Sequence, residues 1–225
     1  MGIAKNPDMV TIGALMILVP GLLFTNAMRD IIYGDTNSGI NRIVQVFLVA
    51  AAICLGTATA WNTASLLWGT PVAAVPPHDA LFWKAVACFF GCYGFAILFN
   101  IHGPGVWACA FGGLLTWAVY RLTLALGGSE VLGNFAGAVV ASLYSETMAR
   151  IRKYPAISYL VVSIFPQIPG AGIYYTMNYA VRGDMEMFSS KGMLTIAVAG
   201  IIAVGVLLVS TSFRLWTVLK SRKRT

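Results

Sequence analysis

The chain has 225 residues, of which 58% are hydrophobic and only 10% are charged, and its mean hydropathy is +0.78. Soluble domains carry about a quarter charged residues, so this composition excludes a water-soluble protein and leaves no room for a sizeable soluble domain. The 15 Lys and Arg outnumber the 8 Asp and Glu. We do not expect nucleic acid binding, because these charges lie between apolar runs and in the C-terminal tail, where they act as orientation signals and meet anionic lipid headgroups.

Seven long apolar runs follow one another along the sequence, and a chain of this length has room for about seven spans of about 20 residues. We therefore expect an all-α polytopic membrane protein with about seven transmembrane helices. The expected spans are 9–33, 43–68, 81–101, 106–126, 131–150, 156–182 and 192–219. The proline-rich stretch 69–80 is the expected joint between two structural units. All four cysteines lie inside apolar runs, where small packing residues are the favoured interpretation.

The distribution of basic residues predicts the orientation of the chain. If the basic tail is cytoplasmic, alternation places Arg150, Arg152 and Lys153 inside, whereas the external loops receive only scattered single cations. That asymmetry predicts an N-terminus outside and a C-terminus inside a bacterial cytoplasmic (inner) membrane.

An internal repeat relates the first and sixth spans. The segment from Pro20-Gly21 to Gly34-Asp35 overlays the segment from Pro169 to Asp184 at a constant offset of 149 residues. Spans one and six run in opposite directions, so we expect an inverted-topology repeat, which is typical of secondary transporters. The expected organisation is 1–69, the last two spans of an incomplete first repeat; 70–80, a connecting loop; and 81–225, a complete five-span second repeat with a basic tail.

The Pro-Gly pairs lie near the centres of their spans and predict two broken helices at mid-bilayer depth. Proline lacks the backbone donor and glycine permits an unwound backbone, so each pair leaves a half-helix N-terminus that favours a carboxylate. A simple proline kink is the alternative interpretation of each break.

Polar side chains near the breaks are the expected substrate-binding residues, because a polar group inside a span is costly without a partner or a function. The expected set is Pro20, Gly21, Thr25, Asn26, Arg29, Gln167, Pro169, Gly170, Tyr174, Tyr175 and Asn178. Helix-helix hydrogen bonding is the alternative for Asn26, and packing or interfacial contact is the alternative for the two tyrosines.

Two carboxylates are the expected proton-coupling groups. Asp30 is the first, although an anchoring ion pair with Arg29 or Arg42 explains it equally well. Glu146 is the second, but Arg150 stands at i+4, where a helix-surface ion pair would suffice. Gly133 and Gly137 are interpreted as a packing face of small residues, spaced for close helix contact.

The stretch LMILVPGLLFTNAMRDIIYGDTNSGINR, residues 15–42, closely resembles the signature region of the bacterial threonine/serine exporter family. The later segments GGLLTWAVY, residues 112–120, and PQIPGAGIYYTMNYAVRGD, residues 166–184, resemble that family's second half. The chain is thus similar to the last two spans of the first half plus the complete second half. The family motif falls on Pro20, Gly21, Asn26, Arg29, Asp30, Gly34, Asp35, Gly39, Pro169, Gly170 and Tyr174.

This resemblance implies export of threonine and serine driven by the proton gradient, as in an antiporter, through two five-span halves. Relatives carry three further spans and a hydrophilic portion before the first motif. We therefore expect a partner membrane subunit or a second copy to supply the missing spans, or the chain to be a fragment of a longer reading frame. The expected partners are the lipid bilayer, a small amino-acid or carboxylate substrate, and protons.

Two other functions stay open. A small dicarboxylate such as succinate would also suit the half-helix N-termini and Arg29, and the chain could instead be a nontransporting partner or regulatory subunit. An enzyme is not expected, because His78 and His102 are the only histidines and neither has catalytic or metal-ligand spacing. No cofactor or metal is expected.

Overall fold

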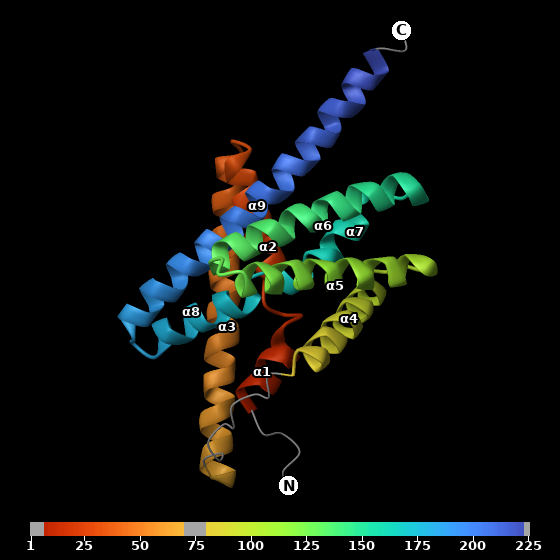
Figure 1. Ribbon diagram of the computed structural model, residues 1–225. Coiled ribbons are helices and arrows are strands. Elements are labelled where there is room, and N and C mark those ends of the chain that lie inside the picture. Colours follow the sequence, from red (N-terminus) through yellow and green to blue (C-terminus); the bar gives the residue numbers. More distant parts are fainter. Residues whose placement is uncertain (1–6, 70–79, 223–225) are drawn as a thin grey trace. The chain divides into compact units, whose positions relative to one another are not determined.

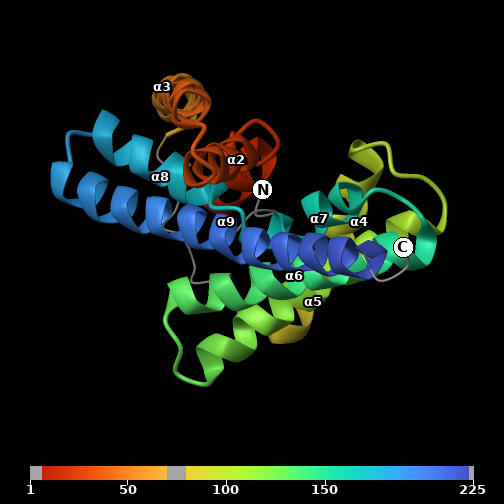
Figure 2. The same ribbon diagram turned by 90° about the horizontal axis from the view of Figure 1, so that it is seen from above.

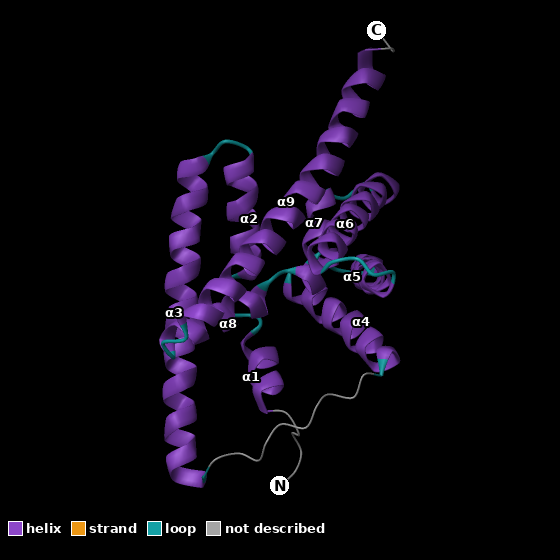
Figure 3. Ribbon diagram, turned by 60° about the vertical axis from the view of Figure 1, so that its left-hand side comes forward, coloured by secondary structure: helices purple, strands orange, loops and turns teal. Residues whose placement is uncertain are grey.

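The computed structural model of the protein describes residues 7–69 and 80–222, and all its regular elements in that part are helices (Figure 3). They are α1 (Pro7–Leu15), α2 (Gly21–Ile32), α3 (Thr36–Trp68), α4 (Leu81–Leu98), α5 (Pro104–Ala125), α6 (Glu130–Arg152), α7 (Ala156–Ser163), the 3-10 helix η1 (Phe165–Gln167), α8 (Gly170–Val181) and α9 (Met185–Arg222). The predicted all-α fold is therefore confirmed for these residues. The predicted connecting loop at 70–80 lies outside them, apart from its last residue.

Four of the described helices are long and apolar enough to cross a membrane, namely α3, α4, α5 and residues 185–220 of α9. The number rises to five if α7 with η1 and α8 are counted as one broken span. The sequence predicts seven. The helix α6 carries polar residues along its length, and α1 and α2 are each too short to cross alone. Crossing by these segments stays a prediction.

Local sequence signals explain where several helices begin and end. The side chain of Asp35 accepts a hydrogen bond from the Ser38 N–H at the start of α3, and Ser129 caps α6 in the same way through the Leu132 N–H. Pro104 occupies the first turn of α5, where its missing N–H costs nothing. These caps satisfy backbone groups that would otherwise be unpaired at helix ends.

Packing divides the chain into two compact units. The first comprises Met1–Asp79 with Pro169–Ile196, and the second comprises Ala80–Ile168 with Ala197–Thr225. The helix α9 contributes its first part to one unit and the remainder to the other. The sequence predicts a boundary between two repeats at 70–80. A boundary between repeats need not be a boundary between packed units, so it stays a prediction.

In the first unit, α2 and α3 form an antiparallel pair joined by the short turn at Gly34 and Asp35 (Figure 3). The buried Gly39 permits this close approach, because a Cβ there would lie 2.9 Å from the Ala27 carbonyl oxygen and would overlap the Ile31 side chain. The helix α8 packs against α3 and also contacts α2. Figure 2 looks along the axis of α3 and shows α8 beside the first part of α9.

In the second unit, α5 and α6 run side by side and α4 packs against α5 (Figure 1). The core there consists of side chains from α4, α5 and α7, all of them small or medium in size except Tyr159: Cys92, Ala96, Val106, Cys109, Ala110, Tyr159 and Val162. Small residues let helix backbones approach closely inside a membrane, where dispersion contacts replace the hydrophobic effect. Cys92 and Cys109 are thus buried packing residues, each with a free thiol.

Candidate functional site

The two Pro-Gly breaks have the same backbone geometry. Pro20 precedes α2 with φ −79° and ψ 45°, and Pro169 precedes α8 with φ −77° and ψ 45°. Each half-helix is 12 residues long and is followed by a glycine at positive φ, 92° at Gly34 and 78° at Gly183. These glycines adopt a conformation that other residues rarely reach.

Hydrogen bonding repeats with the same offset of 149 residues. The Asp35 N–H donates to the Asp30 carbonyl oxygen over 3.0 Å, and the Asp184 N–H donates to the Tyr179 carbonyl oxygen over 3.0 Å. The Asp184 carboxylate also accepts a hydrogen bond from the Met187 N–H at 3.0 Å. In the first copy, the Asp35 carboxylate accepts the equivalent hydrogen bond from the Ser38 N–H. The two copies therefore fold alike locally, whereas their inverted topology in a membrane stays a prediction.

The second half-helix begins next to the segment that precedes the first. A Cβ on Gly170 would lie 3.4 Å from the terminal methyl group of Met16 and 3.5 Å from a methyl group of Val19. Gly170 and Val19 are both buried. The N-cap residue of each half-helix is a proline, and no side chain caps the first-turn N–H groups. The first-turn amides of α8 therefore lie beside the residues that lead into the break before α2.

The polar residues that follow the breaks differ in how fully they are engaged. Thr25 is buried and its hydroxyl donates to the Gly21 carbonyl oxygen at 3.2 Å. Asn26 is half-buried, and its side chain has no hydrogen bond to any residue that the structure describes. Thr25 therefore helps to shape α2, whereas Asn26 keeps its amide available.

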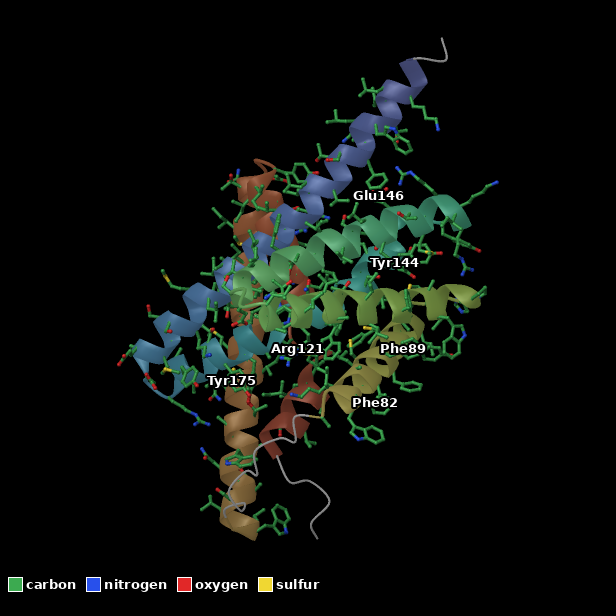
Figure 4. The ribbon with its side chains drawn as sticks, viewed as in Figure 1. Phe82, Phe89, Arg121, Tyr144, Glu146 and Tyr175 are labelled. Carbon is green, nitrogen blue, oxygen red and sulfur yellow. The ribbon has the colours of Figure 1, made fainter. Side chains whose placement is uncertain are left out.

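On the second half-helix, Tyr174 joins α8 to α3. Its hydroxyl lies 3.4 Å from the Thr57 hydroxyl oxygen, and its carbonyl oxygen accepts a weak hydrogen bond from the Cys54 thiol at 3.4 Å. The ring of Tyr174 packs edge-on against that of Tyr175, at 5.7 Å between centroids. Figure 4 shows Tyr175 on α8.

One turn further along α8, Asn178 is occupied by a neighbour on its own helix. Its side-chain oxygen accepts a hydrogen bond from Arg182 Nε at 3.0 Å. The structure therefore brings Tyr174 close to α3 and directs Asn178 to the end of α8.

Asp30 forms an ion pair at the end of α2. Its carboxylate lies 2.9 Å from the Arg42 guanidinium and accepts a hydrogen bond from the Ser38 hydroxyl at 3.4 Å. The Asp30 side chain is 15% exposed and that of Arg42 is 40% exposed. Of the two partners expected from the sequence, Arg42 is the one in ion-pair contact, while Arg29 is half-buried nearby on α2.

Glu146 lies on α6 of the second unit (Figure 4) and pairs with Arg150 at 2.6 Å, the i+4 ion pair that the sequence allows. Arg150 also stacks over the Phe213 ring, 4.4 Å from its centroid. Glu146 therefore belongs to an ion pair on α6 whose arginine packs over Phe213 of α9.

A largely apolar cavity of about 230 Å³ lies within the first unit. Residues of α2, α3, α8 and α9 line it, and several are equivalent in the two repeat copies: Phe24 with Ile173, Val46 with Thr195, and Phe47 with Ile196. The hydroxyls of Thr176 and Thr195 already donate to carbonyl oxygens in their own helices. The cavity therefore offers few free polar groups to a bound solute.

The residue before the second break, Gln167, is buried in the second unit. Neither its side-chain nitrogen nor its side-chain oxygen has a hydrogen-bond partner among the described residues, and the same is true of the buried Ser163 hydroxyl four positions earlier. The sequence marks Gln167 because it flanks the break. It does not single out Ser163, a small hydroxyl residue inside the apolar run AISYLVVSIF, although the i, i+4 spacing of the two residues is a visible signal.

Long apolar helices, two Pro-Gly interruptions and polar side chains beside them define a multi-pass helical membrane protein of the transport class. A family model described as threonine/serine exporter, ThrE, matches residues 84–212, and a second ThrE model for threonine/serine exporters matches residues 1–64. The chain belongs to the threonine/serine exporter family, which confirms the resemblance, and the protein is a membrane exporter. No curated protein and no solved structure matches it.

Proposed function

We propose that this protein exports threonine and serine across the bacterial cytoplasmic membrane in exchange for protons, with its N-terminus outside and its C-terminus inside. The observation that carries the proposal is the close approach of the α8 start to the segment entering the first break, where a Cβ on Gly170 would lie 3.4 Å from Met16 and 3.5 Å from Val19. Discontinuous helices that meet inside a transporter form substrate sites in many secondary carriers.

The uncapped first turn of α8 supports recognition of the substrate carboxylate. Backbone N–H groups at a helix N-terminus point along the axis, and the helix dipole adds a favourable potential for an anion. The half-buried Asn26 amide supplies a further hydrogen-bonding group on the other half-helix. Together these groups favour a small polar solute that carries a carboxylate.

The ion pair of Asp30 with Arg42 supports a role for Asp30 in proton coupling. A carboxylate in a transmembrane region is costly and marks a proton or ion pathway in many transporters. Protonation of Asp30 would release Arg42 and weaken the link between the end of α2 and the first turns of α3. Such a change couples proton binding to the position of the first half-helix.

Transport by reconstituted protein tests this function. We expect vesicles containing the wild type to release threonine and serine when a pH gradient is imposed, and Asn26→Ala to lower that rate about tenfold or more at equal membrane abundance, because a substrate contact is lost. Asn62→Ala, which alters an exposed asparagine of α3, is the matched control and should transport normally.

The choice of substrate decides between the candidate functions. Succinate efflux without threonine or serine efflux would replace the proposed substrate with a dicarboxylate. Absence of transport of all three solutes by an intact, monodisperse preparation, even with a co-expressed partner membrane protein, would argue for a nontransporting subunit. Equal rates for Asn26→Ala and wild type would remove Asn26 from the site while leaving the function in place.

A further inference from the structure

The strongest unexplained feature of the second unit is the pair of buried polar side chains that precedes the second break. Gln167 is 6% exposed and Ser163 is fully buried, yet all three of their side-chain polar atoms lack hydrogen-bond partners among the described residues. A buried polar group without a partner is destabilising, and native structures pair the great majority of such groups. The pair therefore indicates a partner that is not part of the described chain.

Two glycines make room for these side chains. A Cβ on Gly137 of α6 would lie 2.6 Å from Gln167 Cδ and 2.8 Å from its Oε1, and would overlap Nε2. A Cβ on Gly112 of α5 would overlap the Ser163 hydroxyl oxygen and lie 2.7 Å from the Tyr144 ring. The Gln167 amide thus lies against the bare backbone of α6, and the Ser163 hydroxyl against that of α5. We call Ser163, Gln167, Gly112 and Gly137 the glycine notch.

The chemistry of the notch favours a small neutral partner that can both donate and accept hydrogen bonds. The Gln167 amide offers a donor at Nε2 and an acceptor at Oε1, and the Ser163 hydroxyl offers both functions on one atom. A hydroxyl group, whether of an alcohol or of water, is a small neutral group that both donates and accepts in return. A carboxylate only accepts and would carry its charge into an uncharged pair, which is costly without a counter-ion.

We propose that the glycine notch binds the side-chain hydroxyl of the exported amino acid and thereby distinguishes threonine from its apolar isostere valine. This inference rests on the proposed function and assigns the specificity-determining residues within it. Sites built to hydrogen-bond a substrate hydroxyl reject the analogue that lacks it, because their polar groups are then left unpaired.

The test measures the ratio of threonine to valine efflux from the same vesicles, loaded with both amino acids under different isotopic labels. This ratio cancels differences in protein amount and folding. We expect the wild type to favour threonine, and Gln167→Met, which keeps the length of the side chain but removes both polar atoms, to lower the ratio about tenfold or more. The threonine rate should fall while the valine rate stays constant or rises.

Gln45→Met is the matched control, because Gln45 is an exposed glutamine of α3 and its substitution should leave the ratio unchanged. Ser163→Ala makes a smaller change and carries the test if Gln167→Met does not accumulate; it too should lower the ratio. A ratio equal to wild type in Gln167→Met and Ser163→Ala would overturn the proposal and would assign the notch to a buried water. Equal loss of both rates would overturn it in favour of a structural role.

The wild-type protein shows whether the proposed function or only the hydroxyl site is wrong. A wild-type protein that moves neither amino acid, alone or with a co-expressed partner membrane protein, contradicts threonine and serine export itself. A wild-type protein that exports threonine, with a selectivity unaffected by the notch, contradicts only the assignment of the hydroxyl site.

Discussion

Asp30 forms an ion pair with Arg42 and accepts a hydrogen bond from Ser38. We expect neutralisation of Asp30 to affect transport more than it affects stability. Arg42 is 40% exposed, and partly exposed ion pairs contribute about 1 kcal/mol or less to stability. Asp30→Asn should therefore accumulate nearly normally. We expect it to lose the response of efflux to an imposed pH gradient, because the titratable carboxyl group is gone, while exchange of external for internal threonine continues.

The double variant Asp30→Asn with Arg42→Gln distinguishes coupling from anchoring. If Asp30 couples transport to protons, the double variant has normal abundance and still does not respond to the gradient. A recovered gradient response would show that Asp30 serves only to neutralise Arg42. Glu186→Gln, which neutralises an exposed carboxylate in the first turn of α9, is the control and should behave as wild type.

The sequence predicts residues of interest better than it predicts their contacts. Gln167 is visible because it is a polar residue close to Pro169, whereas Ser163 is buried against Gly112, which is 51 positions earlier in the chain. Asn178 looks equally suitable for a ligand in the sequence, yet Arg182 occupies its side-chain oxygen. Hydrogen-bond satisfaction is a tertiary property, so the pattern of residues alone does not determine it.

The close approach of α2 and α3 depends on the missing side chain of Gly39. We expect Gly39→Ala to lower the free energy of unfolding by about 1–3 kcal/mol, because the new methyl group overlaps Ile31 and approaches the Ala27 carbonyl oxygen. Gly56→Ala on the same helix meets nothing within 4 Å among the described residues. It should be neutral or stabilising by up to about 1 kcal/mol, as alanine favours helix. Thermal unfolding of the purified variants checks the contrast; equal melting temperatures would show that the two helices separate without cost.

Helix positions follow closely from the apolar runs, but helix starts do not. The runs predict spans that begin at residues 43 and 192, whereas α3 begins at Thr36 and α9 at Met185. Both helices extend by about two turns into polar sequence, because Asp35 and Asp184 accept hydrogen bonds from their first-turn amides. Hydropathy detects the membrane-embedded portion of a helix, and capping determines where the helix begins.

At the scale of the whole molecule, the inverted repeat requires the two ends of the sixth segment to lie on opposite sides of the membrane. In a cysteine-free background, we expect a single cysteine at Lys153 to be protected from an impermeant thiol reagent in intact cells, and one at Asp184 to be labelled. Both positions lie outside the apolar runs. Permeabilised cells, in which both positions should react, provide the control. External labelling at both positions would contradict the inverted topology.

The prolines at the two breaks also limit how the exporter can move. Pro20 and Pro169 have no N–H to donate, and a proline ring clashes with the preceding turn of a continuous helix. Neither break can therefore close into a straight helix with a complete set of backbone hydrogen bonds. We therefore expect exchange between inward-open and outward-open states to displace α2 and α8 as preformed helices. We then expect the barrier to transport to come from rearranged packing, such as that of the Met16 and Val19 side chains beside Gly170, and not from refolding of the backbone.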